Sequence, residues 1–436
     1  ESFFIGDNMR RQVQRGAADY IPVSLHETQQ LIRRGVVGCD AAFIQVSPPG
    51  RHGRVSLGIS VDIGPAAIET AKYVVAVVNP NMPYTYGDGE IELSRIDCLV
   101  EDDSPLDETV FPLPDEIERA IGRHCAELVE DGSCLQLGIG AIPDATGMAL
   151  KAKHDLGIHT EMFTDSMVEL IECGAVNNSK KQIHRGKTVT TFAFGSQRIY
   201  DYIDDNPAVE ILPVEYVNDP DVICQNDNMI SINAAVEVDL FGQVCAESVG
   251  TKHMSGSGGQ IDYVRGACQS RGGKSFIAFT STAKGGTISK IKPILTPGAV
   301  VTTSKNDVDY IVAEYGEKKM LSVVKGAAEA YEVECDVVLI GKSSSGASDD
   351  KAIEIVMRCA RTIPWFTEFH DVGSVGGSDD ASEMLRRVQK NGGVGSYIGL
   401  GADFTASFHD KAFDFDEGVL APSVELFVKM VEDIHS

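Results

Sequence analysis

Glu237 is the side chain whose setting in the sequence most favours chemistry. It lies in the stretch "INAAVEVDLFGQV", residues 232–244, where apolar and polar residues alternate as they do in a β-strand. Val236, Val238 and Leu240 would share one face of that strand, and Glu237 would point to the other. One interpretation is a half-buried strand whose polar face meets water. The other is a nucleophilic carboxylate on a rigid element, followed by a glycine turn that lets a substrate approach.

A glycine-rich run follows this strand in the sequence. It comprises Ser255, Gly256, Ser257, Gly258, Gly259 and Gln260. Backbone N–H groups without bulky side chains suit either a bound anion or an oxyanion that develops during a reaction. Flexible turns use the same composition, so the run gains meaning only beside the carboxylate strand.

Basic residues gather in the same part of an otherwise acidic chain. They are Arg265, Arg271, Lys274, Lys284, Lys290, Lys292 and Lys305. Such a group is either a solvated face or a landing surface for a phosphorylated cofactor.

Two other motifs are weaker. In "GIGAIPDA", Gly138 and Gly140 follow a predicted strand, but Pro143 replaces the third glycine of a dinucleotide fingerprint, so we expect a tight turn or a substrate-facing loop. "IHTEMFTD" holds His159 and Glu161 without a recognised metal spacing, and a histidine satisfied at a strand end is the favoured interpretation.

The composition limits the classes of function. With 436 residues and a net charge of -26, the chain should form two or three domains and should not bind nucleic acid or anionic membranes by bulk attraction. Its ten cysteines show neither zinc nor disulfide spacing, which favours reduced thiols and a cytoplasmic location. No apolar stretch is long enough to span a membrane. The absence of an initiating Met suggests a fragment.

The pattern of elements predicts an α/β protein with four segments. Residues 1–100 alternate short apolar runs with helical segments, and residues 101–116 read as an acidic, proline-bearing linker. Residues 117–318 form a second α/β region that opens with a helix carrying Ile117, Ile121, Cys125 and Leu128 on one face. Residues 321–436 change character to α+β, with a terminal helix that presents Leu420, Val424, Phe427, Val428 and Val431.

Several blocks in order resemble the acetyl-CoA hydrolase/transferase family. They include "VSPPGRHGRVSLGISVD", "GIGAIPDA", "HTEMFTD", "INAAVEVDLFGQV", "SGSGGQIDYVRGA" and "VVTTSKNDVDYIVAEYG", and they cover residues 1 to about 316. The resemblance implies two CoA-transferase-like α/β domains. Relatives carry further N-terminal residues, so the first domain would be truncated and one edge of its sheet would be bare.

The same resemblance implies an acyl-CoA:carboxylate CoA-transferase, with butyryl-CoA or 4-hydroxybutyryl-CoA and acetate as substrates. It implies a glutamyl-CoA thioester on Glu237, with Gly258 and Gly259 donating to the oxyanion. Binding of the CoA thioester, a substrate rather than a permanently bound cofactor, would involve Gly138, Gly140, Ser255, Gly256, Ser257, Gln260 and Lys284. Two alternatives stay open: hydrolysis of the thioester, and a truncated, fused chain that binds CoA or a partner without turnover. Self-association is expected because relatives associate.

After residue 320 the chain instead resembles the C-terminal part of zinc aminoacylases and aminobenzoyl-glutamate hydrolases, through "GGSDDASEMLRRVQKNGG" and "FHDKAFDFDE". His409 matches a metal-ligand histidine of that family, although Phe408 stands where close relatives often have a second histidine. The other ligands come from a portion absent here, and one histidine cannot hold a dinuclear site. We therefore expect His409 to be a vestige and the chain to hold no catalytic metal.

Overall fold

The computed structural model describes residues 2–50, 52–109, 112–314, 348–369, 387–396, 398, 400 and 416–435. The chain forms two compact units, Glu1–Cys335 and Asp336–Ser436. In the described part no helix is both long and apolar enough to cross a membrane.

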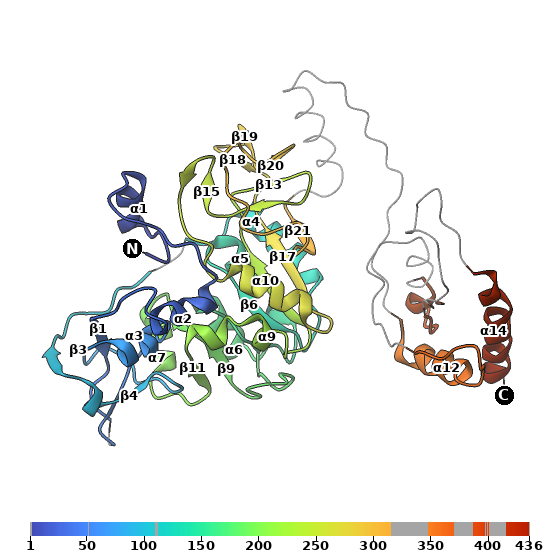
Figure 1. Ribbon diagram of the computed structural model, residues 1–436, viewed down its shortest axis with the longest axis horizontal. Coiled ribbons are helices and arrows are strands. Elements are labelled where there is room, and N and C mark those ends of the chain that lie inside the picture. The colour runs from blue at the N-terminus through green and yellow to red at the C-terminus, as the bar shows by residue number, and fades with distance from the viewer. Residues whose placement is uncertain are drawn as a thin grey trace. The chain divides into compact units, whose positions relative to one another are not determined.

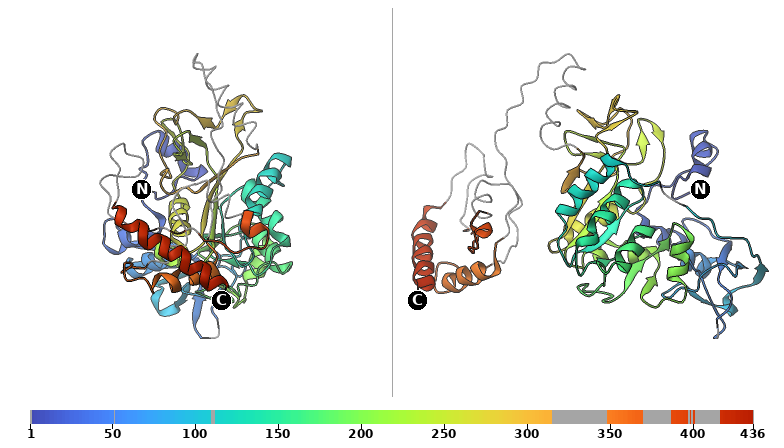
Figure 2. Two further views of the ribbon diagram at one scale, coloured as in Figure 1. Left: turned by 90° about the vertical axis from the view of Figure 1, so that its right-hand side faces the viewer. Right: turned by 180° about the vertical axis from the view of Figure 1, so that it is seen from behind.

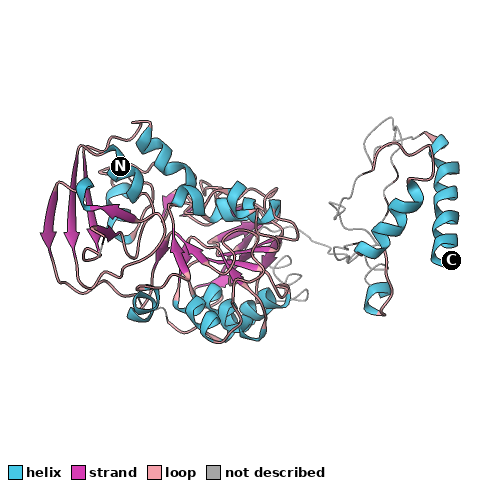
Figure 3. Ribbon diagram, turned by 90° about the horizontal axis from the view of Figure 1, so that it is seen from below, coloured by secondary structure: helices cyan, strands magenta, loops and turns pink. Residues whose placement is uncertain are grey.

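A small parallel sheet begins the first unit. Its strands lie in the order β1 (Ala41–Val46), β3 (Tyr73–Val78) and β5 (Cys98–Glu101), and they run side by side in Figure 3. The crossover between β1 and β3 contains α3 (Gly64–Thr70), which packs on α2 (Thr28–Arg33). β1 is an edge strand, and its Phe43 side chain is 78% exposed.

A five-stranded parallel sheet forms the centre of the first unit. Its order is β21 (Tyr310–Val312), β17 (Lys274–Ala278), β12 (Met229–Asn233), β6 (Cys134–Leu137) and β7 (Gly157–Ile158). Helix α10 (Gln260–Gln269) packs on β12 and β17 and lies in front of the sheet in Figure 1. Helices α4 (Glu116–Glu127) and α5 (Ala141–Ala149) cover the other face and come to the front, in teal, when the unit is seen from behind (Figure 2). Two covered faces explain why the strands read as nearly continuous apolar runs.

Shorter elements complete the first unit. The helical ones are α1 (Asp7–Gln14), η1 (Leu25–Glu27), η2 (Leu93–Arg95), η3 (Leu150–Ala152), α6 (Asp165–Glu172), α7 (Gln197–Ile203), α8 (Val214–Val217) and α9 (Pro220–Ile223). The strands are β2 (Arg54–Ser56), β4 (Glu90–Glu92), β8 (Met162–Phe163), β9 (Thr188–Thr190), β10 (Phe192–Ala193), β11 (Val209–Ile211), β13 (Glu237–Asp239), β14 (Val244–Cys245), β15 (Ser248–Val249), β16 (Lys252–His253), β18 (Thr282–Ala283), β19 (Ile288–Ser289) and β20 (Ile291–Lys292).

Helix α4 packs closely on α5 at a glycine. A Cβ on Gly122 would lie 2.6 Å from the carbonyl carbon of Ala145 and 2.7 Å from the backbone nitrogen of Thr146. The predicted apolar face of α4 is only partly correct, because Ile121 and Cys125 are buried whereas Ile117 and Leu128 are exposed. The sheet and α5 cover the middle of the helix face and leave its two ends in solvent.

The close approach of α4 and α5 gives a testable stability effect. We expect Gly122→Ala to lower the free energy of unfolding by about 1–3 kcal/mol, because the backbone of α5 must move to admit a methyl group. Urea unfolding measures the change. Gly38→Ala is the control, since a Cβ there meets no atom within 4 Å. Equal stability of the two variants would show that the helices separate at no cost.

The stretch predicted as one strand around Glu237 is broken into two. β12 ends at Asn233, and β13 begins at Glu237 and pairs with β14 and β20 in a separate small sheet. The alternation predicted from the sequence is wrong here: Leu240 is 58% exposed, while Glu237 and Asp239 are buried with Val238. Hydrogen bonds allow both carboxylates to be buried: Asp239 accepts them from the turn before β14, and Glu237 accepts them from the distant Thr296.

The second unit contains a pair of helices, α12 (Asp350–Ala360) and α14 (Leu420–His435), with the short η4 (Glu417–Val419) before α14. Its small core includes Cys359, Ile363 and Leu426. The apolar stripe predicted on the terminal helix is exposed rather than packed on α12. His409 lies outside the described residues.

Candidate active site

The carboxyl ends of β6, β7 and β12 meet at one edge of the central sheet, which is where α/β proteins bind ligands. Gly138 and Gly140 follow β6 there, as predicted, and Gly140 precedes α5 with a φ of +118°. Space is limited at Gly138, where a Cβ would lie 3.2 Å from Asn233 Oδ1 at the end of β12. Glu161 lies just beyond the end of β7, between β7 and β8.

The backbone of Glu161 is held firmly. Its carbonyl oxygen accepts hydrogen bonds from the Thr191 N–H at 3.1 Å, the Phe192 N–H at 3.2 Å and the Thr190 hydroxyl at 2.8 Å. Three donors on one oxygen fix the position from which the side chain extends. A carboxylate built on such a rigid base keeps its geometry when a substrate arrives.

The Glu161 carboxylate lies against the glycine-rich run. Its Oε2 accepts a hydrogen bond from Asn218 Nδ2 at 2.6 Å, and a Cβ on Gly259 would lie only 1.9 Å from the same oxygen. A Cβ on Gly258 would lie 4.0 Å from Oε1. Gly259 immediately precedes α10, so the carboxylate meets the positive end of a helix as well as glycine backbone. This arrangement can hold an anion or a developing oxyanion.

Electrostatics make Glu161 unusual. Burial, together with the like charges on Asp262 and Asp62, raises the pKa of Glu161 to about 7, although hydrogen bonds from Asn218 and the Gly259 backbone lower it. Burial also raises the pKa of Asp62 to about 6. A carboxylate whose pKa lies near neutrality is more basic than an ordinary glutamate and is still substantially ionised at pH 7.

The raised pKa of Glu161 predicts a pH dependence. The nucleophilic form is the ionised one, so covalent chemistry on Glu161 should be lost as the pH falls through about 7. We expect the rate of adduct formation with an acyl-CoA to rise about tenfold between pH 6 and pH 8. Rapid quenching followed by intact mass spectrometry measures it. A rate that is flat over this range would contradict the raised pKa.

The other side of the glycine run is covered by the first residues of the chain. A Cβ on Gly256 would lie 3.2 Å from both a Phe4 ring carbon and the Tyr20 hydroxyl. Tyr20 in turn lies against the His253 ring, with centroids 5.0 Å apart. Because Phe4 is also 3.9 Å from the Cβ position of Gly258, its partly exposed ring lies near Glu161 as well.

Glu237 occupies a different setting. It is 5% exposed, and its two carboxylate oxygens accept hydrogen bonds from the backbone N–H and the hydroxyl of Thr296, each at 2.7 Å. Among the described residues, the carboxylate that comes within 4 Å of the Cβ positions of Gly258 and Gly259 belongs to Glu161, not Glu237. The structure therefore brings the predicted glycine donors to Glu161. The sequence motif around Glu161 suggested at most a metal ligand, so Glu161 was not among the residues predicted for the site.

The remaining predicted residues divide between structural and exposed roles. Gln260 uses its amide to donate to Thr303 at 3.1 Å, and Lys284 is exposed in the turn between β18 and β19. Of the basic group, Arg265, Arg271 and Lys274 pair with Asp307, Asp227 and Glu130. Those pairs favour the solvated-face interpretation for these three residues. His159 is buried and shares a hydrogen bond with the Val217 carbonyl at 2.8 Å.

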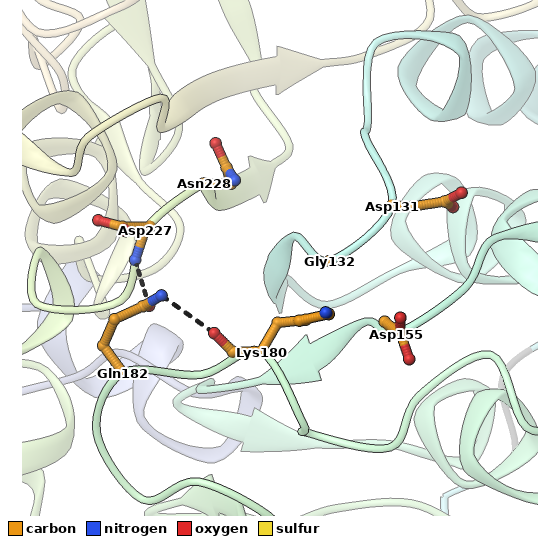
Figure 4. A pocket seen from close by; sticks show the side chains of 7 residues that line it. All are labelled: Asp131, Gly132, Asp155, Lys180, Gln182, Asp227 and Asn228. Carbon is orange, nitrogen blue, oxygen red and sulfur yellow. Dashed lines mark hydrogen bonds between the residues drawn. The ribbon is translucent and has the colours of Figure 1, made fainter. Parts of the chain in front are cut away.

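A separate pocket of about 320 Å³ lies near the amino ends of the central strands (Figure 4). It is lined by Asp131, Gly132, Asp155, Lys180, Gln182, Asp227 and Asn228. Gly132 lies two residues before β6 and Asn228 directly precedes β12, so this pocket is at the opposite edge of the sheet from Glu161. Two carboxylates of the pocket already accept hydrogen bonds within the protein: Asp131 accepts one from the His154 backbone N–H, and Asp155 accepts one from the Asn177 side chain.

The central parallel sheet and the helices on both of its faces define an α/β protein, and a buried carboxylate lies beside glycines at the carboxyl edge of that sheet. Comparison with known proteins gives the family. Residues 1–110 match the acetyl-CoA hydrolase/transferase N-terminal domain, and residues 195–327 match the C-terminal domain of the same family. The chain therefore belongs to the acetyl-CoA hydrolase/transferase family.

Named relatives agree with this assignment. The chain is 51% identical over 315 residues to the 4-hydroxybutyrate coenzyme A transferase of Clostridium kluyveri, covering 72% of this chain and 73% of the relative. It is 38% identical over 328 residues to the butyryl-CoA:acetate CoA-transferase of Anaerostipes caccae, covering 73% and 74%. A crystal structure of a 4-hydroxybutyrate CoA-transferase from Porphyromonas gingivalis matches with a TM-score of 0.62 and 43% identity, covering 71% and 74%.

A shorter match agrees with the second resemblance. The chain is 28% identical over 125 residues to a p-aminobenzoyl-glutamate hydrolase homologue of Haemophilus influenzae, covering 29% of this chain and 30% of that protein. The resemblance predicted for residues 321–436 is to a hydrolase homologue, and the match covers less than a third of that protein.

Proposed function

We propose that this protein exchanges CoA between an acyl-CoA and a free carboxylate, with butyryl-CoA or 4-hydroxybutyryl-CoA and acetate as substrates. The observation that carries the proposal is the Glu161 carboxylate, which lies against Gly259 at the carboxyl edge of the central sheet. The names of the relatives support the same reaction class. The CoA thioester is a substrate, and the proposal needs no permanently bound cofactor.

We propose Glu161 as the nucleophile. Its carboxylate oxygen attacks the thioester carbonyl carbon, the C–S bond breaks, CoA leaves as a thiolate, and an acyl-glutamyl anhydride remains. The thiolate then attacks the glutamyl carbonyl carbon, the anhydride C–O bond breaks, and the acyl group leaves as a carboxylate. The incoming carboxylate attacks the resulting glutamyl-CoA thioester and displaces the thiolate again. Attack of that thiolate on the new acyl carbonyl yields the product and returns Glu161.

The neighbours of Glu161 fit each of these steps. Asn218 Nδ2 holds one carboxylate oxygen, so the other is available for attack. The glycine run from Gly256 to Gly259 offers N–H groups where negative charge develops on the tetrahedral intermediates, a kind of contact that is worth about 2.7–4 kcal/mol per donor in other enzymes. The Phe4 ring, near the same glycines, supplies an apolar surface for the acyl chain.

Glu237, which the sequence predicts as the nucleophile, is the rival candidate. Whichever of its oxygens attacks would first have to release a hydrogen bond from Thr296, because each oxygen accepts one. Unmaking hydrogen bonds to a buried carboxylate costs about 1.5–3 kcal/mol each. In Glu161 the Asn218 hydrogen bond is made to Oε2, and Oε1 faces the glycine run at 4.0 Å from the Cβ position of Gly258, which is why we prefer Glu161.

Hydrolysis differs from transfer only in what resolves the glutamyl thioester. Incubation of butyryl-CoA with and without acetate separates the two. We expect acetyl-CoA to accumulate with acetate and little free CoA to appear without it. Free CoA released at the same rate in both reactions would favour the hydrolase, and unreacted butyryl-CoA in both would favour a chain that binds without turnover.

The finer expectations from the sequence are kept as proposals. They are the division into segments 1–100, 101–116, 117–318 and 321–436, the contribution of Gly138, Gly140, Ser255, Ser257, Gln260 and Lys284 to CoA binding, self-association, and a cytoplasmic location. The compact unit Glu1–Cys335 supports a boundary after the CoA-transferase part.

A further inference from the structure

His26 and Asp262 form a side-chain pair that the chemistry above does not use. His26 Nδ1 lies 2.9 Å from Asp262 Oδ1, and the His26 backbone N–H donates to Oδ2 at 3.3 Å. Asp262 is in the first turn of α10 and is 1% exposed, whereas the His26 side chain is 24% exposed. A buried carboxylate that engages one distant residue twice is a defined contact between α10 and the segment around η1.

Asn218 joins this pair to Glu161. The Asn218 side chain donates from Nδ2 to Glu161 Oε2 at 2.6 Å, and it also lies close enough to the Asp262 carboxylate to lower the pKa of that group. Its Oδ1 is buried and has no hydrogen-bond partner among the described residues. The amide nitrogen therefore faces two carboxylates, and this determines which end of the Asn218 amide points toward Glu161. Reversal would place Oδ1 against the Glu161 carboxylate, where two acceptors repel.

We propose that His26 and Asp262 are positioning residues that hold the Asn218 amide toward the Glu161 carboxylate. The inference rests on the proposed function of Glu161. Asp262 orients the amide, and His26 both orients Asp262 and balances its charge. Neither residue touches the reacting atoms.

The charges around this chain of contacts determine what its loss should do. Glu161 faces Asp62 from the loop before α3, and Asp262 and the buried Tyr263 from α10. His26 faces Asp262, Glu27 and Asp219. The hydrogen bond to Asp262 raises the pKa of His26, which favours a positive charge on the ring beside this acidic cluster. Loss of His26 leaves the Asp262 charge uncompensated near Glu161, whereas Asp262→Asn removes a like charge.

Two variants therefore shift the pH profile in opposite directions. We expect His26→Gln to move the midpoint for adduct formation to higher pH and Asp262→Asn to move it to lower pH. Both should slow the step about 10- to 100-fold because the amide is less well oriented, with KM for acyl-CoA within about twofold of wild type. A purely structural role would not move the midpoints in opposite senses.

The test measures the rate of the covalent adduct with butyryl-CoA across pH 5.5–8.5 in the full chain. His124→Gln is the matched control, since His124 lies on the outer side of α4 and is half exposed. Wild-type rates and midpoints in both variants, or a raised KM with an unchanged rate, would overturn the inference. If Asp262→Asn does not fold, an unshifted midpoint in the partly exposed His26→Gln overturns it alone. No adduct in wild type, or an equal adduct in Glu161→Gln, would instead refute the proposed function.

Discussion

Glu161→Gln is expected to abolish CoA transfer and to lower kcat/KM by at least about a thousand-fold. Glutamine keeps the size of the side chain and can still meet Asn218, but an amide cannot attack a thioester to form the anhydride. Cooperative unfolding should be retained, because the backbone of Glu161 is held by its carbonyl oxygen rather than by its carboxylate. Steady-state assay of butyryl-CoA with acetate measures the loss.

Glu237→Gln is the matched control for that experiment. It removes a carboxylate that the sequence singles out and that Thr296 engages through two hydrogen bonds. We expect activity within about tenfold of wild type and a loss of about 1–3 kcal/mol in the free energy of unfolding, because a buried acceptor is replaced by a donor facing the same groups. Abolished transfer in a folded Glu237→Gln, with activity retained in Glu161→Gln, would restore Glu237 as the nucleophile.

Gly259→Ala should have the second-largest effect. The added methyl carbon would lie 1.9 Å from Glu161 Oε2 and 2.3 Å from Asn218 Nδ2, so the carboxylate and its amide donor must both move. Displacement of a nucleophile by about 1 Å can cost 100-fold, and loss of an oxyanion donor costs 100- to 1000-fold. We expect kcat to fall by at least about 100-fold.

The backbone conformation of Gly259 separates the effect of the added methyl group from any effect of backbone strain. Its φ is -88°, which alanine adopts without strain, so the effect measures the contact rather than the turn. Gly38→Ala, where a Cβ meets nothing, controls for the added methyl group. Near-normal kcat in folded Gly259→Ala would mean that the carboxylate does not react in the position seen here.

The sequence predicts much of the framework of this site. Short apolar runs separated by helical segments correctly indicate a parallel α/β fold, and the glycines of "GIGAIPDA" and "SGSGGQ" lie beside the carboxyl edge of the central sheet. These signals are local: a strand followed by glycine and then a helix is written in consecutive residues. The fold class follows from them because both faces of such a sheet must be covered.

The choice between the two glutamates is not local. Alternation places Glu237 on a polar face, but the residue that buries it is Thr296, 59 positions away. The Glu161 carboxylate accepts a hydrogen bond from Asn218, 57 positions away, and lies against Gly259, which is still further along the chain. No periodicity carries such information. One usable signal was the place of Glu161 just after a short strand, where the carboxyl ends of parallel strands converge on a ligand.

The most direct test of the account is to locate the covalent intermediate. Butyryl-CoA is incubated briefly with the full chain, the reaction is quenched, and the modified peptide is identified by mass spectrometry. We predict a CoA-sized adduct on the peptide that contains Glu161, absent from Glu161→Gln and present in Glu237→Gln. An adduct on the Glu237 peptide, or none in a demonstrably folded protein, would contradict the account.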